Sequence, residues 1–145
     1  MSRLLLCIAL AGCGGAPPPP VEAATSAALA PCPASPNCVS SQADPSDAEH
    51  HTAPLSLHGD PADAVDRLAR IIRSHERTRI THTDDRVLRA TYTSRVFRFV
   101  DDVELRIDAE AGLVHVRSAS RVGYDDLEAN PERVARIRAD WDAAR

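Results

Sequence analysis

The sequence of 145 residues contains no lysine, and all 17 of its basic residues are arginine. Without lysine the protein cannot form a Schiff base with a substrate, and it cannot use the lysine of a phosphate-binding loop. The acidic residues number 21, which gives a formal net charge of -4. A duplex-binding protein presents a basic surface, so we do not expect nucleic acid as a partner.

Aromatic residues are also scarce, at 3% of the chain. Aliphatic side chains must therefore supply most of the core, and the length allows one folded domain. The core residues that we expect from the sequence include Val65, Leu68, Ile72, Leu105, Ile107 and Val116.

The N-terminus has the pattern of an export signal. Arg3 precedes the apolar run 4–10, which is too short to cross a bilayer but suits the hydrophobic part of a signal peptide. The following Leu-Ala-Gly-Cys13 resembles the lipobox of bacterial lipoproteins. By that resemblance residues 1–12 are a signal peptide, and lipidated Cys13 anchors the protein to a membrane. The alternative is an ordinary signal peptide with a fortuitous cysteine.

Export implies the cell envelope, with the domain facing the periplasm. Gly14 stands where an inner-membrane retention signal favours Asp, so by analogy we expect the outer membrane rather than the inner one. Residues 13–31 are rich in Pro and Ala and cannot bury enough apolar surface to fold. We therefore expect a disordered tether, followed by a single α+β domain over residues 32–145.

The cysteines agree with export. Cys7 lies in the signal peptide and Cys13 is the lipidation site, which leaves Cys32 and Cys38 as a pair in an oxidising compartment. We expect a disulfide; a metal clip is the alternative, although five intervening residues are not the usual zinc spacing. The six histidines show no ligand spacing such as H-E-x-x-H. We expect no metal site and no cofactor.

Sequence periodicity predicts two helices that flank about four strands. Asp60-Pro61 is typical of a helix start, and Asn130-Pro131 predicts a second start before a final helix. The expected strands are residues 78–83, residues 87–93, a strand with inward apolar residues at odd positions from Phe97 to Ile107, and residues 113–121. Strands flanked by helices predict an antiparallel sheet with both helices on one face, preceded by a disulfide-closed loop.

Asp101 interrupts the inward apolar row of the third strand. If the turn pairs Asp108 with Leu113, counting places Asp101 opposite Ser120 and Glu104 opposite Arg117. The polar and arginine side chains at this end form a candidate site for an anion or a lipid headgroup. Its residues are Arg95, Arg98, Asp101, Arg117, Ser118, Ser120 and Arg121. The alternative is that Asp101 accepts hydrogen bonds from Ser120 or from an arginine and simply fixes the register of the strands, since a buried charge requires a bonding group.

Three strings carry a family resemblance: CPASPNCVSSQ, FRFVDDVEL and VRSASRVGYDDLEANPERVARIR, which begin at Cys32, Phe97 and Val116. Together they resemble the bacterial and plastid domain of unknown function family 1499. The sequence departs from the family at Glu128, where Gly is common, and at Pro131, where a basic residue is commoner. The resemblance implies an exported or membrane-associated domain and supplies no catalytic residue.

Three functions remain open. The first is a non-catalytic envelope lipoprotein that binds an anionic ligand or an envelope protein through the candidate site. The second is a hydrolase of an envelope substrate with Asp101 or Asp102 as the base, although His115 is expected on the face opposite the serines and no G-x-S-x-G motif occurs. The third is a structural assembly subunit that uses residues 124–127 and the last helix for contacts.

Overall fold

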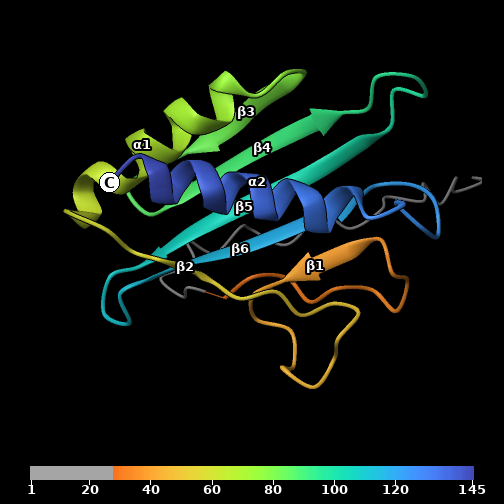
Figure 1. The fold of residues 1–145 in the computed structure, drawn as a ribbon, viewed down its shortest axis with the longest axis horizontal. Helices are drawn as coiled ribbons and strands as arrows, with labels where there is room; N and C mark the ends of the chain where they lie inside the picture. Colours follow the sequence, from red (N-terminus) through yellow and green to blue (C-terminus); the bar gives the residue numbers. More distant parts are fainter. Residues whose placement is uncertain (1–27) are drawn as a thin grey trace, which may run out of the picture.

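The computed structural model describes residues 28–145 (Figure 1). The proposed signal peptide, Cys13 and nearly all of the proposed tether lie outside these described residues. Within them, neither helix is long and apolar enough to cross a membrane.

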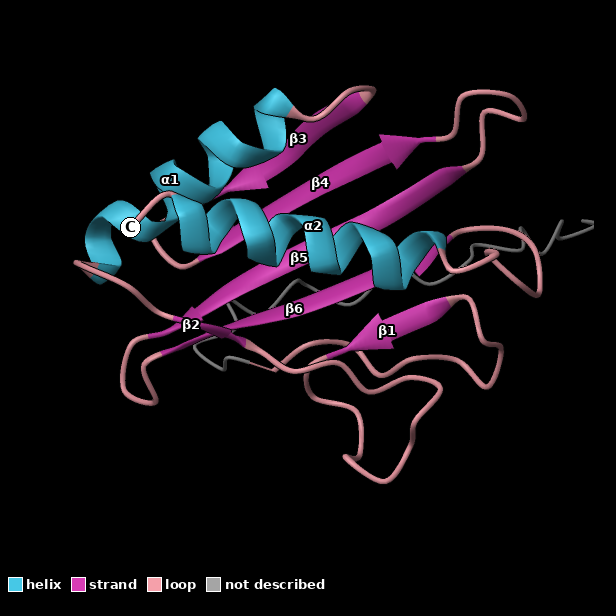
Figure 2. Ribbon diagram, viewed as in Figure 1, coloured by secondary structure: helices cyan, strands magenta, loops and turns pink. Residues whose placement is uncertain are grey.

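The fold is one antiparallel sheet with two helices on one of its faces (Figure 2). The expected α+β class and the covering of one face are therefore confirmed. The six strands have the order β1-β6-β5-β4-β3, with β2 also paired to β6. The elements in chain order are β1 (Cys38–Ser40), β2 (Leu55–Ser56), α1 (Pro61–Ser74), β3 (Thr78–Thr83), β4 (Val87–Thr93), β5 (Val100–Asp108), β6 (Leu113–Ser120) and α2 (Ala129–Ala143).

The core lies between the sheet and the helices. Inward side chains of β4, β5 and β6, such as Leu88, Leu105 and Val116, are fully buried. They meet the apolar faces of α1 and α2, where Leu68 and Trp141 are among the largest buried side chains. The Asp60 side chain accepts a hydrogen bond from the Ala62 backbone N–H at 2.9 Å, which confirms the expected cap of α1.

The β5–β6 hairpin has the register expected from the sequence. Asp108 pairs with Leu113, Asp101 with Ser120 and Glu104 with Arg117. The disulfide is present, and Cys32 and Cys38 are joined at an S–S distance of 2.07 Å. It closes the segment immediately before β1 against the start of that strand.

Three sequence expectations need correction. The sheet has six strands rather than about four, because β1 and β2 are too short to show a period. β5 begins at Val100, so Phe97 and Phe99 lie outside it and are exposed rather than inward. α2 begins at Ala129 with Glu128 at its N-cap, and Asn130 is a buried residue of the first turn rather than the cap.

The sheet face away from the helices is rich in arginine. Because strand residues alternate between the two faces, the neighbours of the inward residues point to this outer face. Arg79, Thr91 and Asp102 lie side by side across β3, β4 and β5. The arginines of the outer face and its edge are Arg77, Arg79, Arg89, Arg98, Arg106, Arg117 and Arg121, whereas Asp102 and Glu104 are its central carboxylates. This face is therefore basic although the chain as a whole carries a net charge of -4.

Candidate functional site

The inward end of the β5–β6 hairpin is polar and closed. Asp101 is buried, and its Oδ2 accepts a hydrogen bond from Nη2 of Arg133 on α2 at 2.5 Å. Nη1 of the same guanidinium donates to Ser118 Oγ at 3.0 Å and to Asn130 Oδ1 at 2.6 Å. Arg133 thus neutralises the carboxylate and joins the helix to both strands of the hairpin.

Asn130 extends this cluster to the start of the domain. Its side chain is fully buried, and Nδ2 donates to the backbone oxygen of Asn37 at 3.0 Å and to Ser120 Oγ at 3.1 Å. It also donates to Asp126 Oδ2 at 2.5 Å. Ser118 Oγ donates to Asn130 Oδ1 at 2.6 Å, so the serines of the predicted site bind α2.

The cluster continues toward α1 through an aromatic ring. The Arg133 guanidinium lies over the Tyr92 ring, 4.7 Å from its centroid. The Tyr92 hydroxyl is 2.8 Å from Nδ1 of buried His75, whose Nε2 is 2.7 Å from Asp140 Oδ2. Burial raises the pKa of the Tyr92 hydroxyl, so it stays protonated. The hydroxyl can therefore serve as the donor in its contact with the His75 ring.

These contacts assign the Asp101 cluster a structural role. Asp101, Ser118 and Ser120 come together as the sequence predicted, yet each is bound by a side chain of α2. Sequence reasoning missed Arg133 and Asn130. Their spacing of three residues places both on one face of the helix. That this face binds the polar end of the hairpin follows only from the packing of α2 on β6, which the sequence does not show.

The arginines of the predicted site lie elsewhere, on the outer face of the sheet or in the β4–β5 loop. Arg98 and Arg121 line a hollow of about 450 Å³ together with Arg77 and Arg79 of the β3 edge. Threonine hydroxyls and Val100 complete its wall: the remaining lining residues are Thr78, Thr81, Thr91, Thr93 and Val100. We call this the arginine hollow.

Two guanidinium groups of the arginine hollow are bound by carboxylates. Arg121 Nε and Nη2 each lie 2.8 Å from an oxygen of Asp102, which raises the pKa of Arg121. Arg77 Nη1 donates to Glu76 at 2.7 Å. Arg79 and Arg98 are both exposed, and neither guanidinium group has a hydrogen bond or ion pair to any residue in the described range 28–145. The hollow therefore offers two free guanidinium groups to a ligand.

The other two predicted arginines lie outside the arginine hollow. Arg117 is half-buried and donates to the backbone oxygen of Pro31 at 3.4 Å, so a segment before β1 covers it. The expected pair between Arg117 and Glu104 does not form, because Glu104 binds Arg89 and Arg106 instead. Arg95 is exposed on the β4–β5 loop.

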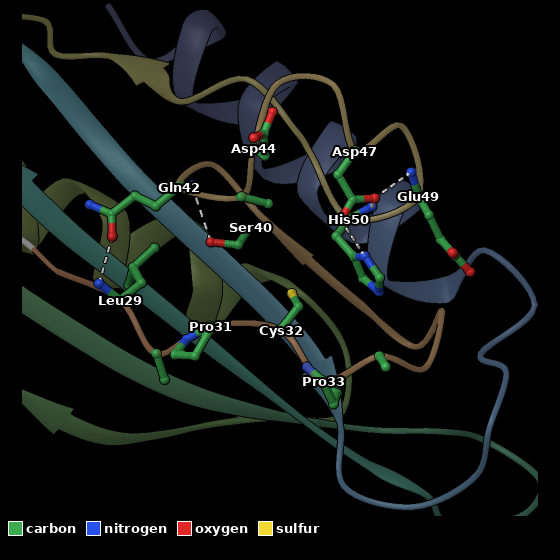
Figure 3. Close-up of a pocket in the computed structure, with 13 residues that line it drawn as sticks. Leu29, Pro31, Cys32, Pro33, Ser40, Gln42, Asp44, Asp47, Glu49 and His50 are labelled. Carbon is green, nitrogen blue, oxygen red and sulfur yellow. Dashed lines mark hydrogen bonds and ion pairs between the residues drawn. The ribbon is translucent and has the colours of Figure 1, made fainter.

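A larger hollow, about 700 Å³, lies between residues 29–34 and the loop 42–50 (Figure 3). Several of its polar side chains are hydrogen-bonded to neighbouring residues. Asp47 Oδ2 is 2.8 Å from His50 Nδ1, and Gln42 Oε1 accepts from the Leu29 backbone N–H at 2.6 Å. Among the described residues, no group of three or more His, Cys, Asp or Glu side chains is placed to hold a metal ion. This hollow is a seam between two loop segments.

The contact between His50 and Asp47 in this seam predicts that the stability of the fold depends weakly on pH. The side-chain hydrogen bond with Asp47, and then the Ser35 carbonyl, raise the pKa of His50 above 6.5. A raised pKa means that protonated His50 stabilises the fold below about pH 6.5, and that this stabilisation is lost as the pH rises through the folded-state pKa. We expect His50→Gln to remove on the order of 0.5 kcal/mol at pH 6 and less at pH 8.5.

Urea unfolding of the protein and of His50→Gln at both pH values measures this effect. His51→Gln is the matched control, because His51 Nδ1 is hydrogen-bonded to the Ala43 backbone oxygen at 3.1 Å and not to a carboxylate of the described residues. An equal loss of stability from His50→Gln at both pH values would contradict the assignment.

A family model described as "Protein of unknown function (DUF1499)" matches residues 28–141. The match covers every strand of the sheet, all of α1, and α2 as far as Trp141. No curated protein matches the chain.

Proposed function

Starting from the fact that the chain belongs to the DUF1499 family, we propose that it is a non-catalytic envelope lipoprotein whose domain binds a phosphate- or carboxylate-bearing ligand in the arginine hollow. The sequence motif at Cys13 supports the lipid anchor and the envelope location. The free guanidinium groups of Arg79 and Arg98 carry the binding proposal. Arginine presents a planar fork of donors that matches the oxygens of a phosphate or carboxylate.

The surroundings of the arginine hollow support an anionic ligand. Thr91 and Thr93 bring hydroxyl groups that donate hydrogen bonds to the same oxygens. Asp102 pairs with Thr91, a residue that lines the hollow, so its carboxylate lies on the same face of the sheet. Arg121 binds both oxygens of this carboxylate. The carboxylate is thus neutralised and repels an anion less than a free one.

A hydrolase receives less support. Asp101 and Asp102, the carboxylates suggested as a base, are bound by Arg133 and Arg121. Each carboxylate is therefore already occupied by a guanidinium group. No catalytic role is therefore proposed for either residue.

The proposal is tested by titrating the protein with inorganic phosphate at constant ionic strength in a calorimeter. We expect saturable binding, and we expect Arg79→Ser/Arg98→Ser to weaken it by about tenfold or more, since a hydrogen bond to a charged group contributes about 1.5–3 kcal/mol. Arg70→Ser/Arg73→Ser is the matched control, since these exposed arginines lie on α1 and not on the outer face.

The control removes the same charge, so it separates a local site from general attraction of anions. Equal phosphate affinity of the two double variants would contradict the proposal. So would the absence of saturable binding to the unaltered protein.

A further inference from the structure

Two loops display all the large apolar side chains that are exposed in residues 28–145. Val96, Phe97 and Phe99 belong to the β4–β5 loop, and Val122, Tyr124 and Leu127 belong to the β6–α2 loop. The exposed fraction reaches 74% for Phe97 and 86% for Leu127. Exposed apolar residues normally lie scattered, and a cluster marks an interaction surface. We call these six residues the apolar tips.

The two loops lie at the same end of the sheet (Figure 1). β4 ends and β5 begins there, and the end of β6 is beside them because Asp101 pairs with Ser120. The Arg121 backbone N–H donates to the oxygen of Val100 at 3.0 Å, which ties the second loop to the base of the first. The apolar tips therefore form one end of the molecule.

Local contacts hold the apolar tips away from the core. Ser94 N–H donates to the backbone oxygen of Phe99 at 2.8 Å, and Ser94 Oγ accepts from the Phe99 N–H at 2.8 Å. The Phe97 and Phe99 rings stack on each other with centroids 5.5 Å apart. In the other loop, Asp125 Oδ1 accepts from the Leu127 N–H at 2.7 Å. These bonds fix the loops with their apolar side chains outward.

Positive and negative side chains lie on opposite sides of the apolar tips. Arg98, in the middle of the first loop, and Arg121, at the start of the second, both line the arginine hollow. The acidic residues of the second loop face a different hollow, beside α2 and the loop 48–52: they are Asp125, Asp126 and Glu128. Guanidinium groups therefore rim the tips on the outer face of the sheet, and carboxylates do so on the other side.

We propose that the apolar tips insert into the interfacial region of a phospholipid bilayer, and that the arginine hollow beside them binds the headgroup phosphate of an anionic lipid. Aromatic and aliphatic side chains enter the headgroup and acyl boundary, while arginine stems extend to the phosphates. Each arginine near an anionic surface adds to this attraction. The inference rests on the proposed anion site, and it identifies the ligand as carried by a membrane.

Sedimentation with lipid vesicles tests the inference on the full chain carrying Cys13→Ser, so that no acyl anchor contributes. Vesicles of phosphatidylcholine are compared with vesicles that also contain phosphatidylglycerol. We expect binding to the mixed vesicles, weaker binding without phosphatidylglycerol, and a loss of about tenfold or more in Phe97→Ser/Leu127→Ser. Both altered residues lie outside the arginine hollow, so this variant should keep its affinity for inorganic phosphate.

Phe97→Trp gives a second, direct measurement of insertion. We expect its fluorescence to shift to shorter wavelength with mixed vesicles, against the background of buried Trp141. Equal vesicle binding by the parent chain and Phe97→Ser/Leu127→Ser, together with no fluorescence shift, would overturn the inference. Self-association of the chain that Phe97→Ser/Leu127→Ser abolishes, without vesicle binding, would overturn it in favour of a protein contact.

The phosphate titration separates this inference from the proposed function. Saturable phosphate binding without vesicle binding would overturn the membrane inference alone and leave a soluble anion as the ligand. Vesicle binding that depends on Phe97 and Leu127 but not on Arg79 and Arg98 would support insertion and overturn the headgroup contact. Failure of both phosphate and vesicle binding would overturn both proposals.

Discussion

Replacing Arg133 with methionine is expected to lower the free energy of unfolding by about 3 to 5 kcal/mol. The substitution keeps much of the length of the side chain but leaves the Asp101 carboxylate buried without its partner at 2.5 Å. It also removes the donor to Ser118 and Asn130. Urea denaturation followed by far-ultraviolet circular dichroism measures the loss.

The double variant Arg133→Met/Asp101→Asn is the control for the charge. Because the neutral amide removes the uncompensated buried charge, we expect the double variant to be more stable than Arg133→Met alone. Arg136→Met is the matched surface control, since Arg136 is exposed on the same helix and its ion pair with Asp140 is 4.0 Å long. If Arg133→Met cost no more than Arg136→Met, the structural role assigned to the Asp101 cluster would be wrong.

Replacing Trp141 with alanine is expected to have a similar cost, about 3 to 5 kcal/mol. Its indole is 1% exposed, lies beneath the Arg67 guanidinium at 4.4 Å, and donates through Nε1 to the Ser56 backbone oxygen at 2.8 Å. One side chain thus joins α2 to α1 and to β2. Calorimetric unfolding of the variant measures the effect as a lower transition temperature.

Trp141→Phe separates packing from hydrogen bonding. Phenylalanine keeps an aromatic ring in the core but cannot donate to Ser56, so we expect a loss of about 1 to 3 kcal/mol. A loss from Trp141→Ala no larger than that from Trp141→Phe would show that the indole contributes little through its packing.

The sequence predicts best the parts of the fold that depend on local patterns. The alternation from Val103 to Ile107 and the turn before Leu113 were enough to set the β5–β6 register residue by residue. The Asp60 cap set the start of α1 in the same way. In each case the signal lies within a few residues of the structure that it determines.

Features that depend on distant partners were not predictable in this way. β1 has three residues and becomes a strand because β6 offers an unpaired edge, which no pattern near Cys38 reveals. Phe97 and Phe99 continue the apolar alternation of β5, yet the strand begins only at Val100 and both rings are exposed in the loop before it. The hydrophobic pattern alone does not distinguish a buried position from an exposed one.

The residues of the predicted site fall into two separate places, the inward Asp101 cluster and the outer arginines, because their positions also depend on distant partners. Alternation correctly places Asp101 and Ser120 on one face, but counting along two strands does not reveal that Arg133 closes this face. It also does not bring Arg79 and Arg98 to one hollow, since Arg79 lies on β3 and Arg98 lies in the β4–β5 loop. The hollow that carries the proposed function depends on β3, which contributed no residue to the predicted site.

The bond from Asn130 to the backbone of Asn37 joins positions 93 residues apart in the chain. A ribosome makes Asn37 first, and the edge of β6 and the first turn of α2 that receive it are made last. The first strand therefore has no partner strand in the sheet until almost the whole domain exists, and long-range pairings of this kind form slowly. Such an order of events leaves the contacts that complete this edge of the sheet to the last stage of folding.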